Sequence, residues 1–128
     1  MPQRDESASE WLRFARGDLA LARTSPGPEV QFELLCFHAQ QAAEKAIKAV
    51  LVHHGIAFPK VHDISRMIGL LPPDVETIPE LPASAALTPY ATFVRYPGVQ
   101  EPVGEEEYRE AVRLAEAVLS WAEEIIGS

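Results

Sequence analysis

The stretch FHAQQAAEKAIK, from Phe37 to Lys48, carries most of the information about the fold of this chain. It lies inside a run that predicts one long helix from about Glu29 to His54. Gly55 is suited to end that helix, because glycine adopts the left-handed backbone conformation easily. At 100° per residue, one face of the helix carries apolar side chains, namely Phe32, Leu35, Cys36, Ala39, Ala43, Ala46, Ile47 and Val50. We expect this face to pack into a core.

Two shorter segments carry helix-start signals. Ser7 and Glu10 form an S-x-x-E capping pattern, which predicts a helix through Arg23. Asp63 is suited to cap a short helix that continues until the prolines at Pro72 and Pro73.

The passage from Pro72 to Pro89 is rich in proline and predicts a loop, with a helical turn or two near Ala83–Leu87. A short helix carrying Tyr90–Arg95 should follow. The last segment, from Glu105 to about Ile126, begins with three acidic residues that suit the positive end of a helix. No alternating β-branched run is present, so the sequence predicts an all-α fold, an antiparallel up-and-down bundle of four to five helices.

Length and composition limit the class of protein. With 128 residues and 47% hydrophobic side chains, the chain fits a single globular domain over residues 1–128. Cys36 is the single cysteine, so no internal disulfide can form and a cytoplasmic location is expected. No run approaches the roughly 18 apolar residues of a membrane span. The formal charge of −8 opposes nonspecific adhesion to nucleic acid, so any such contact must be local, and there is no DNA-specific signal.

A polar stripe interrupts the apolar surface of the long helix. His38, Gln41, Lys45 and Lys48 follow the helical period and line up along it, where they could grip a ligand. The alternative is that the lysines and Glu44 form a solvated face, with His38 as a capped or core histidine.

Asp18 has an unusual place in the first helix, because it lies between Trp11 and Ala22 on the inward face. A buried carboxylate needs a partner. Lys45 or Arg95 could supply it, and such an ion pair could be purely structural.

Leu34, Phe37 and Val52 project from the long helix away from its core face. Either the short helices and the proline-rich loop cover them, or a second copy of the chain does. We favour a homodimer, because twofold pairing is the commonest oligomeric form.

The sequence predicts no metal site and no cofactor. His53 and His54 are adjacent and diverge by 100° on a helix, so they cannot easily face one ion together with His62. No glycine-rich phosphate loop and no G-x-S-x-G turn is present.

Three segments together resemble the HEPN domain family, specifically its small stand-alone prokaryotic branch. They are QQAAEKAIKAVLVHHG at Gln40–Gly55, VHDI at Val61–Ile64 and FVRYP at Phe93–Pro97. The resemblance spans nearly the whole chain. It implies an antiparallel helical bundle, usually dimeric, that binds nucleotide or RNA and often works beside a minimal nucleotidyltransferase in a toxin–antitoxin pair.

Many HEPN proteins are metal-independent ribonucleases marked by an arginine followed, after four to six residues, by a histidine. This chain departs from that pattern, since no histidine follows Arg95 at that spacing. A ribonuclease would need a noncontiguous histidine, such as His62 or His38, to handle a proton while Arg95 holds the phosphate.

The function we expect is therefore that of a binding module. Arg95, Lys45 and His62, with Gln41 and Asp18 nearby, would gather a phosphate. Tyr90 or Tyr96 would offer a ring on which a base stacks. The alternatives are the ribonuclease and a plain dimeric interaction scaffold, in which Arg95 is satisfied by Asp18 or Glu44.

Overall fold

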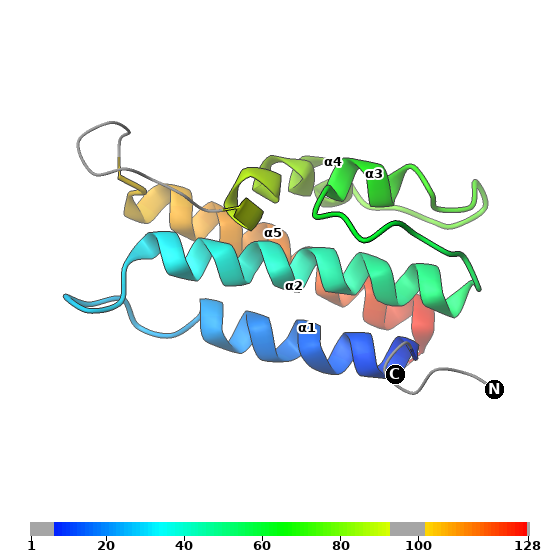
Figure 1. Cartoon of the computed structure of the whole chain (residues 1–128), viewed down its shortest axis with the longest axis horizontal. Coiled ribbons are helices and arrows are strands. Elements are labelled where there is room, and N and C mark those ends of the chain that lie inside the picture. The colour runs from blue at the N-terminus through cyan, green and yellow to red at the C-terminus, as the bar shows by residue number, and fades with distance from the viewer. Residues whose placement is uncertain (1–6, 93–101, 128) are drawn as a thin grey trace.

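The computed structural model describes residues 7–92 and 102–127 of the chain. Its elements in order are α1 (Ala8–Ala22), α2 (Phe32–His53), α3 (Ile64–Ile68), α4 (Glu80–Ala83), the 3-10 helix η2 (Ser84–Thr92) and α5 (Glu105–Ile126). The described residues contain helices and no β-strand, which confirms the all-α prediction (Figure 1).

Helix α2 lies at the centre of the bundle, in contact with α1, α5, α3 and η2 (Figure 1). Helices α1 and α5 run antiparallel, because Arg16 pairs with Glu123 and Arg23 pairs with Glu116, each at 2.7 Å. Helix α5 runs in the same direction as α2. The short helices α3, α4 and η2 form the returning limb between them, so the up-and-down order is completed by three short elements.

The helix starts follow the local capping chemistry. The side chain of Ser7 accepts a hydrogen bond from the backbone N–H of Glu10 at 3.1 Å, and that of Asp63 accepts from Arg66 at 3.3 Å. Both predicted caps are confirmed. Helix α2 starts later than the predicted Glu29, because Gly27 and Val30 exchange two backbone hydrogen bonds of 3.1 Å in a tight turn.

The helix ends show one agreement and two differences. Gly55 follows α2 with φ of 71°, as its left-handed role requires. Helix α3 ends at Ile68, before the expected stop at Pro72. The proline-rich passage is more helical than predicted, since Pro79 caps α4 and Pro89 lies inside η2. Proline is tolerated at the start of α4, where its missing N–H would have no partner.

Small side chains on α2 allow its neighbours to approach closely. The alanines at 39, 42, 43, 46 and 49 are all fully buried. Helix α1 supplies Leu12, Ala15, Leu19 and Ala22 to the same core, and α5 supplies Leu114, Val118 and Leu119. Among the described helices, none combines the length and apolar character that crossing a membrane requires.

Candidate functional site

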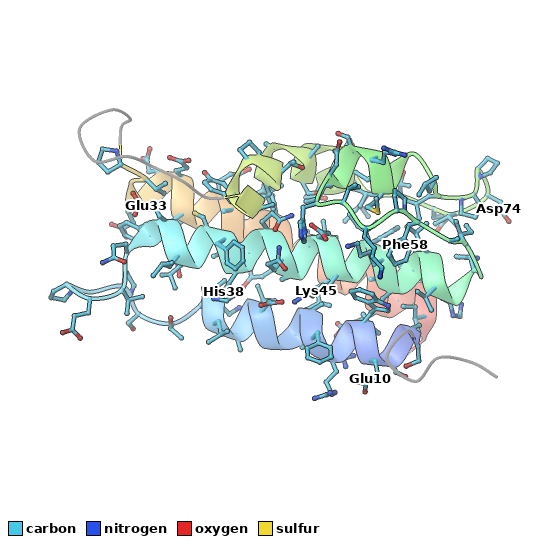
Figure 2. All side chains as sticks on the ribbon, viewed as in Figure 1. Glu10, Glu33, His38, Lys45, Phe58 and Asp74 are labelled. Carbon is cyan, nitrogen blue, oxygen red and sulfur yellow. The ribbon has the colours of Figure 1, made fainter. Side chains whose placement is uncertain are left out.

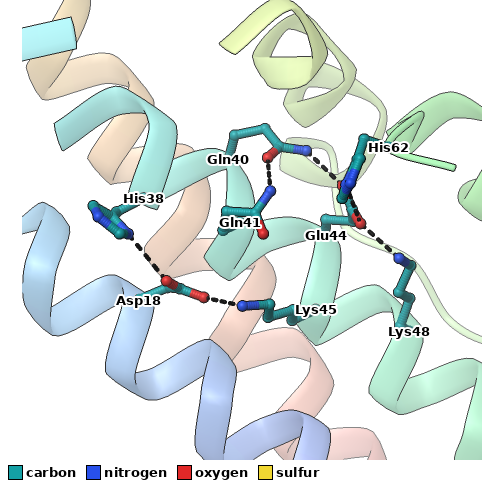
Figure 3. A network of polar contacts seen from close by, with 8 residues as sticks. All are labelled: Asp18, His38, Gln40, Gln41, Glu44, Lys45, Lys48 and His62. Atoms are coloured by element: carbon teal, nitrogen blue, oxygen red, sulfur yellow. Dashed lines mark hydrogen bonds and ion pairs between the residues drawn. The ribbon is translucent and has the colours of Figure 1, made fainter. Parts of the chain in front are cut away.

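Asp18 on α1 is the acceptor of a small polar cluster in the seam between α1 and α2. It accepts from Lys45 Nζ at 2.6 Å and lies 3.0 Å from His38 Nδ1 (Figure 3). The Asp18 side chain is 12% exposed, so the predicted need for a partner is met by Lys45. Figure 2 shows His38 and Lys45 along this seam, with Phe58 further toward the end of α2.

Glu44 is the centre of a second and more deeply buried cluster on α2. Its carboxylate accepts from Lys48 Nζ at 2.6 Å and from Gln40 Nε2 at 2.7 Å (Figure 3). His62, from the segment between α2 and α3, places Nδ1 at 3.0 Å from both carboxylate oxygens. Because Glu44 is 1% and Lys48 6% exposed, the interpretation of these residues as a solvated face is wrong.

An amide relay continues this second cluster along α2. Gln41 donates from Nε2 to Gln40 Oε1 at 2.6 Å, and Gln40 in turn donates to Glu44. Both glutamines are buried. Gln41 therefore uses its amide within the protein, although the sequence pattern places it on the ligand-facing stripe.

Next to Glu44 the surface is hollowed, with a volume of about 360 Å³. We call this cavity the basic hollow. Its lining comes from α1, α2 and the segment after α2, namely Trp11, Lys48, Val52, Ile56, Ala57, Phe58, Lys60 and His62. The ionisable side chains among these are all basic types.

Two aromatic rings form the apolar wall of the basic hollow. Trp11 and Phe58 meet edge to face with centroids 5.9 Å apart. Lys48 Nζ lies 5.5 Å from the Trp11 ring centroid and 5.4 Å from that of Phe58. The site therefore combines ring surface with ammonium groups, a combination suited to an anion with a flat apolar body.

A second hollow, of about 400 Å³, lies where α2 and α5 end. Its lining includes Asp74, Glu76 and Glu124, with His54 and Trp121. This acidic lining would repel a phosphate, so the basic hollow is the better candidate for an anionic ligand.

The predicted site residues are distributed over several places. His62 lines the basic hollow with a side chain that is 54% exposed. Lys45 lies in the seam with Asp18, 5.8 Å from the ring centroid of Phe14. Tyr90 is 9% exposed, belongs to the core and donates its hydroxyl to Glu107.

Arg95 and Tyr96 lie outside the described residues, so their predicted roles stay predictions. The expected proximity of Arg95 to Lys45 also stays a prediction. In the part of the chain that the structure describes, no group of three or more histidine, cysteine, aspartate or glutamate side chains is placed to hold a metal ion.

No sequence pattern marks Trp11, Phe58 or Lys60 as ligand-binding residues. Phe58 and Lys60 lie in an irregular segment, where no periodicity indicates which way a side chain points. For Glu44 a signal did exist: it precedes Ile47 by three residues and Leu51 by seven, and both of those are apolar. That spacing places Glu44 on an inward face.

Comparisons with known proteins agree with this fold. The crystal structure of TT1696 from Thermus thermophilus is similar with a TM-score of 0.78 and 34% sequence identity, over 94% of this chain and 98% of that one. The crystal structure of ST0689, an archaeal HEPN homologue, is similar with a TM-score of 0.70 and 28% identity, over 94% and 98% of the two chains. No curated protein matches the sequence. The model of the HEPN domain matches residues 8–125, and the chain belongs to the HEPN family.

Proposed function

We propose that this protein is a nucleotide- or RNA-binding HEPN module, and that the ligand occupies the basic hollow. The observation that carries the proposal is the convergence of two aromatic rings, Trp11 and Phe58, with the basic side chains of Lys48, Lys60 and His62. Lysines suit the phosphate, and the rings suit the base.

The charge distribution of the protein supports this location. The formal charge is −8, so a phosphate is repelled by the molecule as a whole and needs a local basic patch. Lys60 is exposed and has no ion-pair partner within residues 7–92 and 102–127. It is therefore available to pair with an anion.

Thermal unfolding in the presence of ADP or a short single-stranded oligoadenylate RNA tests the proposal. At about ten times Kd, mass action adds about 1.4 kcal/mol to the free energy of unfolding. For a chain of this length, that corresponds to a rise in Tm of about 5 °C.

The variants Lys60→Gln and Phe58→Ala should lose most of this rise. Arg109→Gln is the matched control for Lys60→Gln, because it removes one positive charge from an exposed position on α5. Absence of any rise with both ligands would contradict the proposal, as would an equal loss of the rise in the control.

One observation favours a second function, the metal-independent ribonuclease. The buried carboxylate of Glu44 holds His62, whose ring is half exposed, as expected of a histidine that exchanges a proton with a ligand. Arg95 would hold the phosphate. RNA cleavage in the presence of a metal chelator, lost in His62→Ala, would support this function, and intact RNA at high protein concentration would exclude it.

The proposed module also includes partners. Leu21 and Leu34 are each 49% exposed, and we infer that a second copy of the chain covers these two side chains in a homodimer. A minimal nucleotidyltransferase, acting with this protein as a toxin–antitoxin pair, is the further partner. Light scattering of the purified protein tests the dimer, and co-purification with a neighbouring nucleotidyltransferase gene product tests the pair.

A further inference from the structure

Glu44 determines which nitrogen of His62 carries the proton. A carboxylate oxygen accepts hydrogen bonds, and both oxygens of Glu44 already accept, from Gln40 and from Lys48. His62 Nδ1, at 3.0 Å from both oxygens, must therefore be the donor. Neutral His62 then carries its proton on Nδ1, and Nε2 is left as an unprotonated acceptor.

This acceptor is the His62 nitrogen that does not contact Glu44. His62 lines the basic hollow, and its Nε2 has no hydrogen-bond partner among the described residues. The other ionisable side chains of the lining, Lys48 and Lys60, are ammonium groups that only donate. A ligand that fits this arrangement carries an anionic group for the lysines and a hydroxyl that donates to the histidine.

A ribonucleotide has both features, because its sugar carries hydroxyl groups close to the phosphate. We propose that His62 Nε2 accepts a hydrogen bond from the ribose 2′-hydroxyl, so that the basic hollow selects ribonucleotides over deoxyribonucleotides. This inference rests on the proposed function and adds a basis for specificity to it. Glu44 acts as a positioning residue, since it determines the tautomer of the histidine.

The expected selectivity is modest. The ring of His62 is 54% exposed, so water can replace a missing ligand hydroxyl. A net hydrogen bond of this kind corresponds to roughly a two- to tenfold difference in Kd.

Two nuclear magnetic resonance measurements test the inference. The first reads the tautomer from the ring nitrogen shifts of the histidines at slightly alkaline pH. His62 is expected to be protonated on Nδ1, as is His38, which faces Asp18 in the same way. His53 and His54 serve as internal references. A His62 protonated on Nε2 would overturn the proposal.

The second measurement is a titration of the protein with ADP, 2′-deoxy-ADP and 3′-deoxy-ADP. ADP should bind more tightly than 2′-deoxy-ADP, and 3′-deoxy-ADP should bind about as tightly as ADP. His62→Asn, whose amide can still donate to Glu44 from the position of Nδ1 but has no atom at Nε2, should bind all three equally. His53→Asn, at the exposed end of α2, is the matched control and should keep the preference.

The outcomes distinguish failure of the proposed function from failure of the ribose selectivity. If the protein bound none of the three nucleotides and no RNA, the proposed function would fail and this inference with it. Equal affinity of the unchanged protein for ADP and 2′-deoxy-ADP would overturn only the selectivity. A preference that persisted in His62→Asn would also overturn it, because another residue would then read the hydroxyl.

Discussion

Lys48→Met should destabilise the protein strongly, although it changes one lysine in a helix. Glu44 and Lys48 are 1% and 6% exposed, and removal of one partner from a buried ion pair costs about 3–5 kcal/mol. Glu44 keeps the hydrogen bonds from Gln40 and His62, so we expect the lower end, about 3 kcal/mol. For a chain of this length, that is a fall in Tm of about 10 °C.

A double-mutant cycle isolates the pair. Glu44→Gln alone leaves the Lys48 ammonium without its carboxylate and should cost a similar amount, about 3 kcal/mol. The double variant Glu44→Gln/Lys48→Met has neither charge, so its loss should be smaller than the sum of the two single losses by about 2 kcal/mol. Urea unfolding followed by circular dichroism measures all three free energies.

The control is the exposed pair of Arg23 with Glu116, whose side chains are 53% and 42% exposed. Arg23→Gln should cost about 1 kcal/mol or less. High salt should reduce that cost further, while it leaves the coupling between Glu44 and Lys48 nearly unchanged. Single losses below about 1 kcal/mol in the buried pair, or strictly additive losses, would refute the claim that burial dominates its energetics.

Two other predictions concern the stability of the helical bundle away from the basic hollow. Burial raises the pKa of Tyr108, and its hydroxyl donates to Ala22 O at 2.7 Å. The unfolded state therefore releases this proton at a lower pH than the folded state does. The free energy of unfolding should fall above about pH 10 in the unchanged protein, and less steeply in Tyr108→Phe. Urea titrations at several pH values measure this difference. Gly55→Ala should lower the free energy of unfolding by about 1–2 kcal/mol, because φ of 71° is left-handed, although no atom lies within 4 Å of the added methyl group. A fall in Tm measures this loss, and an unchanged Tm would contradict it.

The helix ends could be predicted from the sequence where a few neighbouring residues determine them. The Ser7 cap needs only the backbone N–H of Glu10, and the turn at Gly55 needs only a residue without a Cβ. The start of α2 was less predictable. Gly27 and Val30 form a turn by pairing with each other, and that pairing competes with an earlier helix start.

The candidate site could be predicted only in part, because its residues meet through tertiary contacts. Gln40, Glu44 and Lys48 are spaced by four residues, a pattern that exposed helices also show. Their burial depends on the segment after α2, which carries Phe58 and His62 across the helix. No local pattern indicates that path. The need of Asp18 for a partner could be predicted, because an acidic side chain on an apolar helix face requires a hydrogen-bond or ion-pair partner from whichever segment supplies it.

The charge balance around the basic hollow limits how tightly it can hold a single nucleotide. Glu44 already compensates Lys48, so Lys60 supplies the uncompensated charge for a phosphate. One charge-assisted contact contributes about 1.5–3 kcal/mol, and a stacked base adds about 1–3 kcal/mol. The two contributions add to about 2.5–6 kcal/mol, which corresponds to a Kd between about 40 μM and about 15 mM for a mononucleotide, before the entropy of binding is subtracted.

A longer ligand raises this limit, because further bases can stack on rings beyond the hollow. Lys45 lies less than one helical turn before Lys48 and faces the exposed ring of Phe14. Asp18 compensates Lys45, so single-stranded RNA that follows the seam between α1 and α2 would gain a third ring and no further uncompensated charge. Each added base that stacks contributes about 1–3 kcal/mol, which favours an oligonucleotide over a mononucleotide as the ligand of this module.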